Sequence, residues 1–117
     1  MWYRRIGLVL VVVLLITTML GMQASAHSPR FMKLTYDSET LSVMIIHPTF
    51  ARSLHYVYKI DVEKNEELYT SELYETQPKF FVNTYEFSVN ATSGDDLMVS
   101  AYCSLFGKLT QSLTVSS

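Results

Sequence analysis

Three histidines and one cysteine are the residues of this chain whose side chains are best suited to hold a metal ion: His27, His47, His55 and Cys103. Imidazole nitrogen and thiolate sulfur are preferred ligands of zinc, copper and iron. His47 and His55 flank one segment that joins two predicted strands, and a connecting loop can direct both rings toward one point. Spacing alone leaves open a metal-free alternative with an exposed loop histidine, a partly buried one and a buried free cysteine.

Short runs of β-branched and aromatic residues, separated by turn formers, follow one another after residue 27. This is the pattern of β-strands, and no segment here has a sustained helical period. The predicted strands are Met32–Asp37, Leu41–His47, Leu54–Glu63, Glu67–Tyr74, Lys79–Val89, Leu97–Leu105 and Leu109–Val115. About seven such strands predict an all-β fold, an immunoglobulin-like antiparallel β-sandwich.

Alternation along the strands predicts which side chains share a face. His47 falls in the row of Ile45, on an apolar face. His55 falls in one row with Val57 and Lys59, opposite Ile60. The row that contains the cysteine is Val99, Ala101, Cys103 and Leu105.

The first 26 residues have the pattern of a secretory signal. Its parts are a basic start at Arg4 and Arg5, an apolar run over 6–20 and small residues at Ala24–Ala26. The apolar run is shorter than the roughly 20 residues that span a bilayer, which favours cleavage over retention as an anchor. Cleavage leaves one domain, 27–117, that begins with His27 and is secreted or lies in the cell envelope.

Charge and cysteine content limit the partners of this domain. It has seven basic and eleven acidic residues, a net charge of −4 with neutral histidines. This composition argues against nucleic acid and provides no polybasic patch for an anionic membrane. A membrane is expected as a partner only if the signal segment is retained. One cysteine cannot form an internal disulfide, and Asn90-Ala91-Thr92 is a glycosylation sequon in a polar turn.

The residues around the candidate ligands resemble a known family. The relevant segments are His47-Pro48, His55-Tyr-Val-Tyr-Lys-Ile60 and Tyr102-Cys103-Ser-Leu-Phe106-Gly. They are similar to the His-Pro, His-Tyr-Ile-x-x-Ile and Cys-Asn-x-His-Gly motifs of desulfoferrodoxin and neelaredoxin, the superoxide reductases. The resemblance covers nearly all the chain from His27 onward. It implies an immunoglobulin-like sandwich with a mononuclear iron that reduces superoxide. Copper is the alternative metal, because the same set of nitrogen and sulfur ligands suits it.

The resemblance also implies a ligand set. His47 and His55 match two equatorial ligands, Cys103 matches the axial thiolate, and His27 matches an early histidine of the family. Phe106 stands where the family has its final histidine, and the Glu-Lys pair that precedes the early histidine has no match. A free α-amino group on His27, together with its ring, would form a chelate like the copper histidine brace and fill the place left by Phe106.

Two functions therefore follow from the sequence. The first is an exported metal-binding domain that either reduces superoxide or only holds the metal. The second is a metal-free immunoglobulin-like module for adhesion or envelope interactions. A separation above about 6 Å between the histidine nitrogens and the Cys103 sulfur would favour the second, because metal–ligand bonds are about 2.0–2.3 Å long. A blue-copper site is not predicted, since residues 104–117 contain neither histidine nor methionine.

Overall fold

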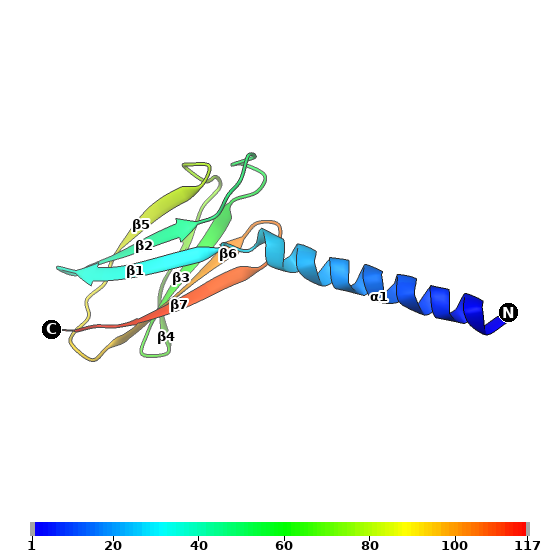
Figure 1. Ribbon diagram of the computed structural model, residues 1–117. Helices are drawn as coiled ribbons and strands as arrows, with labels where there is room; N and C mark the ends of the chain where they lie inside the picture. The colour runs from blue at the N-terminus through cyan, green and yellow to red at the C-terminus, as the bar shows by residue number, and fades with distance from the viewer. Residues whose placement is uncertain (1, 117) are drawn as a thin grey trace.

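The computed structural model describes residues 2–116, and among them the side chains of residues 3–14 and 27–116. A helix is followed by strands at all seven predicted places, which confirms the all-β prediction for the domain (Figure 1). The elements are α1 (Trp2–His27), β1 (Phe31–Asp37), β2 (Thr40–Ile46), β3 (Val57–Lys64), β4 (Glu67–Leu73), β5 (Val82–Ser88), β6 (Asp96–Cys103) and β7 (Lys108–Thr114).

The strands form two antiparallel sheets. One has the order β1-β2-β5 and the other the order β4-β3-β6-β7. The chain crosses from one sheet to the other between β2 and β3, between β4 and β5, and between β5 and β6. Such crossings are the Greek-key connections of immunoglobulin-like sandwiches, so the predicted architecture is confirmed.

Apolar side chains on the inner faces of the two sheets form the core. Each inner strand contributes alternate residues, as expected for a half-buried strand. The fully buried members with the largest side chains are Leu41, Val43, Ile45, Val57, Ile60, Val62, Val89, Leu97 and Val99. The outer strand β4 contributes no buried residue, so the core lies between β1, β2, β5 and the β3–β6 pair.

Two tight turns set the register of their strands at the end of the sandwich opposite α1. Ser38 and Glu39 join β1 to β2, and Asn65 and Glu66 join β3 to β4. All four residues have positive φ angles between 50° and 69°. Two consecutive left-handed residues are the mark of a type I′ turn, whose twist matches that of the flanking strands.

A β-bulge near the start of β3 changes which side chains face the core. The pairing of β3 with β6 shifts between Val57 and Lys59. As a result Val57 is buried on the same side as Ile60, and the predicted row of Val57 with Lys59 is wrong. A bulge inserts one extra residue and reverses the alternation beyond it, which strict alternation does not anticipate.

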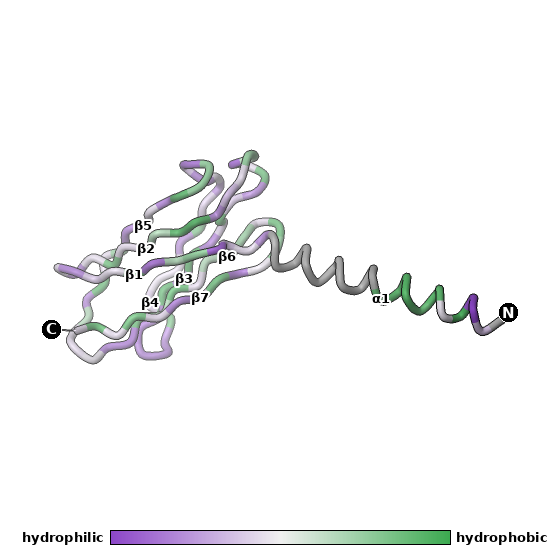
Figure 2. Tube along the Cα trace, viewed as in Figure 1, coloured by the Kyte–Doolittle hydropathy of each residue, from purple (hydrophilic) through white to green (hydrophobic). Residues whose placement is uncertain are grey.

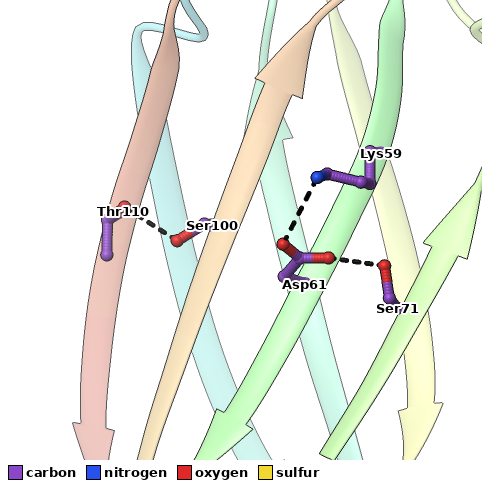
Figure 3. Close-up of polar contacts among 5 residues, drawn as sticks. All are labelled: Lys59, Asp61, Ser71, Ser100 and Thr110. Atoms are coloured by element: carbon purple, nitrogen blue, oxygen red, sulfur yellow. Dashed lines mark hydrogen bonds and ion pairs between the residues drawn. The ribbon is translucent and has the colours of Figure 1, made fainter. Parts of the chain in front are cut away.

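The outer face of the four-stranded sheet carries a polar row (Figure 3). Ser71, Asp61, Ser100 and Thr110 are aligned in register across β4, β3, β6 and β7. The Ser71 hydroxyl donates to Asp61, and the hydroxyls of Ser100 and Thr110 lie 2.9 Å apart. Lys59 forms an ion pair with Asp61 at 3.7 Å. The row satisfies its own polar groups, and among the described residues no cluster of three metal ligands forms here.

The helix α1 extends away from one end of the sandwich (Figure 1). It covers residues 2–26 of the predicted signal segment and continues one residue further, to His27. Its described residues from Leu8 to Leu14 are apolar and exposed, and Figure 2 shows them as hydrophobic. Within the described residues, no helix has an apolar stretch long enough to cross a membrane.

Candidate metal centre

Three of the four predicted ligands meet at the end of the sandwich from which α1 leaves. One ligand atom from each of His47, His55 and Cys103 lies within 4.8 Å of the others. The rings of His47 and His55 are in edge contact, with centroids 4.6 Å apart. The distances between the ligand atoms are thus below about 6 Å, the separation of histidine nitrogen and cysteine sulfur above which a metal-free module would be favoured. The three residues therefore form a candidate metal centre.

His47 is held by the continuation of the β2–β5 pairing. It follows the last residue of β2, and its N–H donates to the carbonyl of Phe81 at 2.9 Å. This keeps the alternation of β2, so the ring faces inward with Ile45 and is 1 % exposed. The predicted face of His47 is confirmed, although the residue lies just beyond the strand rather than inside it.

Gln77 orients the His47 ring, and the sequence alone did not single it out. Its Nε2 donates to two carbonyls, those of His47 at 2.8 Å and Lys79 at 2.9 Å. This assigns Oε1 as the acceptor, and Oε1 lies 2.8 Å from His47 Nδ1 and accepts from the Val57 N–H at 3.3 Å. A neutral His47 therefore carries its proton on Nδ1 and has a free lone pair on Nε2.

His55 lies in the loop between β2 and β3, not in the strand predicted to contain it. Its N–H donates to the carbonyl of Ala51 at 2.7 Å, which closes one helical turn. The Nε2 atom of His55 is buried and has no hydrogen-bond partner among the described residues. Burial, reinforced by the neighbouring His47, lowers the pKa of His55. An unpartnered buried nitrogen on a ring that favours its neutral form is suited to bind a metal.

Cys103 is the last residue of β6 and pairs with Val57 across the sheet. Its N–H donates to the carbonyl of Gly107 at 3.0 Å, which closes a turn where Gly107 has a φ of 85°. Two hydrogen bonds tie this turn to the residue after His55. Ser104 N–H donates to the Tyr56 carbonyl at 2.8 Å, and the Ser104 hydroxyl accepts from the Tyr56 N–H at 3.0 Å. The sulfur and the His55 ring are thereby positioned together.

His27 lies beside the three-residue group rather than inside it. Its ring centroid is 5.4 Å from that of His55. Its carbonyl oxygen is 3.0 Å from His47 Nε2, the atom on which the tautomer leaves a lone pair. Two lone pairs that face each other repel unless a proton or a cation lies between them. A His47 ring protonated on both nitrogens would donate to Gln77 and to His27, and a cation bound at Nε2 would take the place of that second proton.

The donor set narrows the metals that this centre can hold. Two imidazoles and one thiolate fit zinc, copper and iron, whereas calcium and magnesium require oxygen ligands. Two ligands of one such ion lie about 3–4.4 Å apart, so the three atoms need to close only a small distance. Phe106 is in the β6–β7 turn and is 61 % exposed, so its side chain takes no part in the group.

No protein-family model matches this chain, and no curated protein matches it in sequence.

Proposed function

We propose that this chain is an exported domain that binds one redox metal ion through His47, His55 and Cys103. The orphaned Nε2 of His55 carries the proposal, because a buried nitrogen without a partner destabilises the fold unless something binds it. The bond from His47 Nδ1 to Gln77 supports the same conclusion, because it leaves Nε2, which faces the His27 carbonyl, as the atom that a metal would bind. In this proposal the first 26 residues are a signal segment. Cleavage after Ala26 gives His27 a free α-amino group, and His27 then completes the ligand set.

Iron is the proposed metal, with copper as the alternative. The resemblance to the superoxide reductases favours iron, while the set of two histidines and one cysteine also suits copper. Either ion would supply one-electron redox chemistry when bound. Gln77 keeps the His47 ring in one orientation, and the Ser104 bonds keep the cysteine turn against the His55 loop.

Superoxide is the proposed substrate. Its reduction adds one electron and two protons and yields hydrogen peroxide, and the electron would come from an external donor. A shallow pocket beside Cys103, lined by Tyr56, Tyr74, Glu75 and Leu105, supports access of a small molecule to this region. Besides Cys103, the titratable side chains that line this pocket are Tyr56, Tyr58, Tyr74 and Glu75, so a small molecule there would approach the group from the side of the sulfur.

Metal loading tests the binding proposal. The purified protein would be loaded anaerobically with ferrous iron, and separately with copper, then freed of excess metal and analysed for bound metal and visible absorption. We expect close to one ion per chain and a sulfur-to-metal charge-transfer band. Cys103→Ser should abolish the band, whereas Ser112→Ala on the exposed face of β7 should keep it. No retained iron or copper would refute the proposal and favour the metal-free module.

Superoxide consumption tests the enzymatic proposal separately. The iron-loaded protein would receive superoxide together with an excess of a chemical reductant. Reduction produces one peroxide for each superoxide consumed, whereas dismutation produces one for every two. A protein that holds iron with its charge-transfer band but does not accelerate superoxide loss would be a metal-binding domain without this activity.

A further inference from the structure

Exposed apolar side chains gather in three loops at the α1 end of the sandwich. These loops are residues 47–56, 74–81 and 104–107, which connect β2 to β3, β4 to β5 and β6 to β7. Phe50 is 88 % exposed and Leu54 is 73 % exposed. We call the exposed large apolar residues of these loops the apolar rim: Phe50, Leu54, Phe80, Phe81, Leu105 and Phe106.

Contacts between the three loops hold them together. The rings of Phe50 and Phe81 lie edge to face, with centroids 6.0 Å apart, which joins the first two loops. The Ser104 hydroxyl donates to the carbonyl of Leu54 at 3.2 Å, which joins the first loop to the third. Figure 2 shows hydrophobic segments in loops at this end of the sandwich, where α1 leaves it. Exposed apolar patches of this kind commonly mark interaction surfaces.

Basic and acidic residues lie at opposite ends of the sandwich. The α1-end segments, residues 27–30, 47–56, 74–81 and 104–108, contain one acidic residue, Glu75, and these exposed cations: Arg30, Arg52, Lys79 and Lys108. None of the four cations forms an ion pair with a described residue. The far-end turns, residues 37–40, 64–67 and 89–96, contain a single cation, Lys64, and the acidic residues Asp37, Glu39, Glu66, Glu67, Asp95 and Asp96. The net charge of −4 conceals this separation.

The helix α1 meets this end of the sandwich at its last residue. It ends at His27, whose carbonyl contacts His47 and whose ring contacts His55. Its exposed apolar residues from Leu8 to Leu14 belong to the same apolar end of the molecule. The apolar loop tips and the cations without ion pairs share one end, opposite an acidic end, and both stay in the domain after residues 1–26 are released. This is the polarity of a protein that lies on a lipid surface.

We propose that the α1 end of the sandwich docks on the interface of an anionic phospholipid bilayer. The apolar rim enters the boundary between headgroups and acyl chains, and the four cations contact lipid phosphates. The acidic far-end turns face away from the membrane. Docking in this orientation holds His47, His55 and Cys103 close to the membrane surface, and it does not require that a metal is bound.

Tryptophan depth measurements on the full chain test the proposal. Trp2 is the only tryptophan, so Trp2→Phe provides a background into which Phe106→Trp, Phe50→Trp and the far-end control Leu68→Trp are introduced one at a time. Each variant would be added to vesicles of phosphatidylcholine and phosphatidylglycerol that contain lipids brominated high on the acyl chain. We expect quenching at 106 and 50 at least about twofold stronger than at 68, since docked apolar faces reach about 5–10 Å into the interface.

Equal quenching at 106 and 68 would overturn the proposal, because α1 alone would then hold the chain to the vesicle. Emission at 106 and 50 that is already blue-shifted without vesicles would overturn it as well, in favour of a second copy of the chain covering the rim. Charge-reversal variants test the role of the cations separately. Arg52→Glu combined with Lys79→Glu should weaken the quenching at 106 on anionic vesicles, while Lys64→Glu should not. If the quenching at 106 is as strong with Arg52→Glu and Lys79→Glu as without them, the cations have no role in docking.

Discussion

Gln77 shows how one neutral side chain can determine the chemistry of a histidine. It accepts from His47 Nδ1 and donates to the carbonyls of His47 and Lys79, so the amide cannot rotate without losing bonds. Partners of this kind fix the tautomer and orientation of metal-binding histidines. The reactivity of Nε2 is therefore set from the far side of the ring, by a residue in a different loop.

Replacing Gln77 with leucine should weaken both the fold and the site. The change leaves the Val57 N–H and the His47 carbonyl without partners in a buried position, whereas the Lys79 carbonyl keeps its bond from Asn83, and the loss costs about 2 kcal/mol of unfolding free energy. Loss of the ring orientation should lower metal affinity by roughly 10–100-fold. Urea unfolding of the apo protein and a competition titration with a chelator measure the two effects. Gln111→Leu on exposed β7 is the control, and an unchanged affinity for Gln77→Leu would contradict the assigned role.

Tyr85 carries the other buried side-chain atom without a partner among the described residues, its hydroxyl. Burial, with a smaller contribution from Tyr74, raises the pKa of Tyr85 to about 12. The fold thus favours the neutral phenol, whereas the unfolded chain ionises near pH 10. The contribution of Tyr85 to the free energy of unfolding is therefore fully present below pH 10. It is lost as the pH rises through 12, because the unfolded chain ionises first, and the loss at pH 12 is about 2 kcal/mol.

Tyr85→Phe should remove this alkaline loss and stabilise the domain by up to about 1 kcal/mol at neutral pH, since it removes an unsatisfied polar group. Tyr36→Phe is the matched comparison, because the Tyr36 hydroxyl donates to the Val89 carbonyl at 2.7 Å and accepts from the Ala91 N–H at 3.0 Å. That variant should lose about 1 kcal/mol. Urea midpoints between pH 8 and 12 distinguish them, and equal destabilisation of both variants would be inconsistent with an orphaned hydroxyl.

The bulge in β3 is the element that makes the candidate centre possible. It reverses the alternation before Lys59, so Val57 faces the core opposite Cys103. The chain just before Val57 then carries His55 toward the same interior end of the sheet. Bulges recur beside functional sites because they redirect side chains. Here the redirected segment is the one that supplies the histidine with the free nitrogen.

The β3–β4 turn offers a direct test of hairpin geometry. Asn65 and Glu66 are the two central residues of a type I′ turn, and Glu66 has a φ of 69°. This left-handed conformation costs a residue with a side chain about 1 kcal/mol or more. Glu66→Gly should therefore raise the unfolding free energy by about 1 kcal/mol. Glu67→Gly, one position later inside β4, should lower it by a similar amount. Thermal unfolding compares the two, and destabilisation by Glu66→Gly would rule out the assigned turn.

The domain as a unit couples metal binding to folding, because its three candidate ligands come from segments that only the complete sandwich brings together. A metal that binds the folded chain alone stabilises it by about 2.7 kcal/mol at one hundred times its dissociation constant. Ferrous iron or copper should therefore raise the melting temperature of the wild-type protein and leave that of Cys103→Ser nearly unchanged. Calorimetry with and without a chelator measures this. An equal increase in both proteins would show that the metal binds elsewhere.

The separation of charge and apolar surface also belongs to the assembled domain. Arg30, Arg52, Lys79 and Lys108 are dispersed along the chain, and their common location appears only when four connections meet at one end of the sandwich. The same assembly brings Phe50 against Phe81. The sequence-wide charge balance indicates an acidic domain, and this is true of its total but not of its α1 end.

Local pattern was enough to determine the strands and the types of ligand. A strand alternates with a period of two, and turn formers such as Lys64-Asn65-Glu66 interrupt it, so seven strands and the sandwich class follow from neighbouring residues. Imidazole and thiolate chemistry is a property of the residue type, so the candidates could be named before any geometry. Their convergence was only a hypothesis, because spacing in sequence does not determine distance in space.

Tertiary pairing decided the rest. The bulge arises from how β3 aligns with β6, so the inward position of Val57 could not be obtained from the alternation of β3 alone. Gln77 contacts His47 and Val57, which are 30 and 20 positions away in the chain, and no local signal connects a glutamine in a loop with a distant histidine. The sequence carries the chemistry of each side chain, while long-range hydrogen bonds decide which atoms meet, because their partners come together only when the two sheets close on one core.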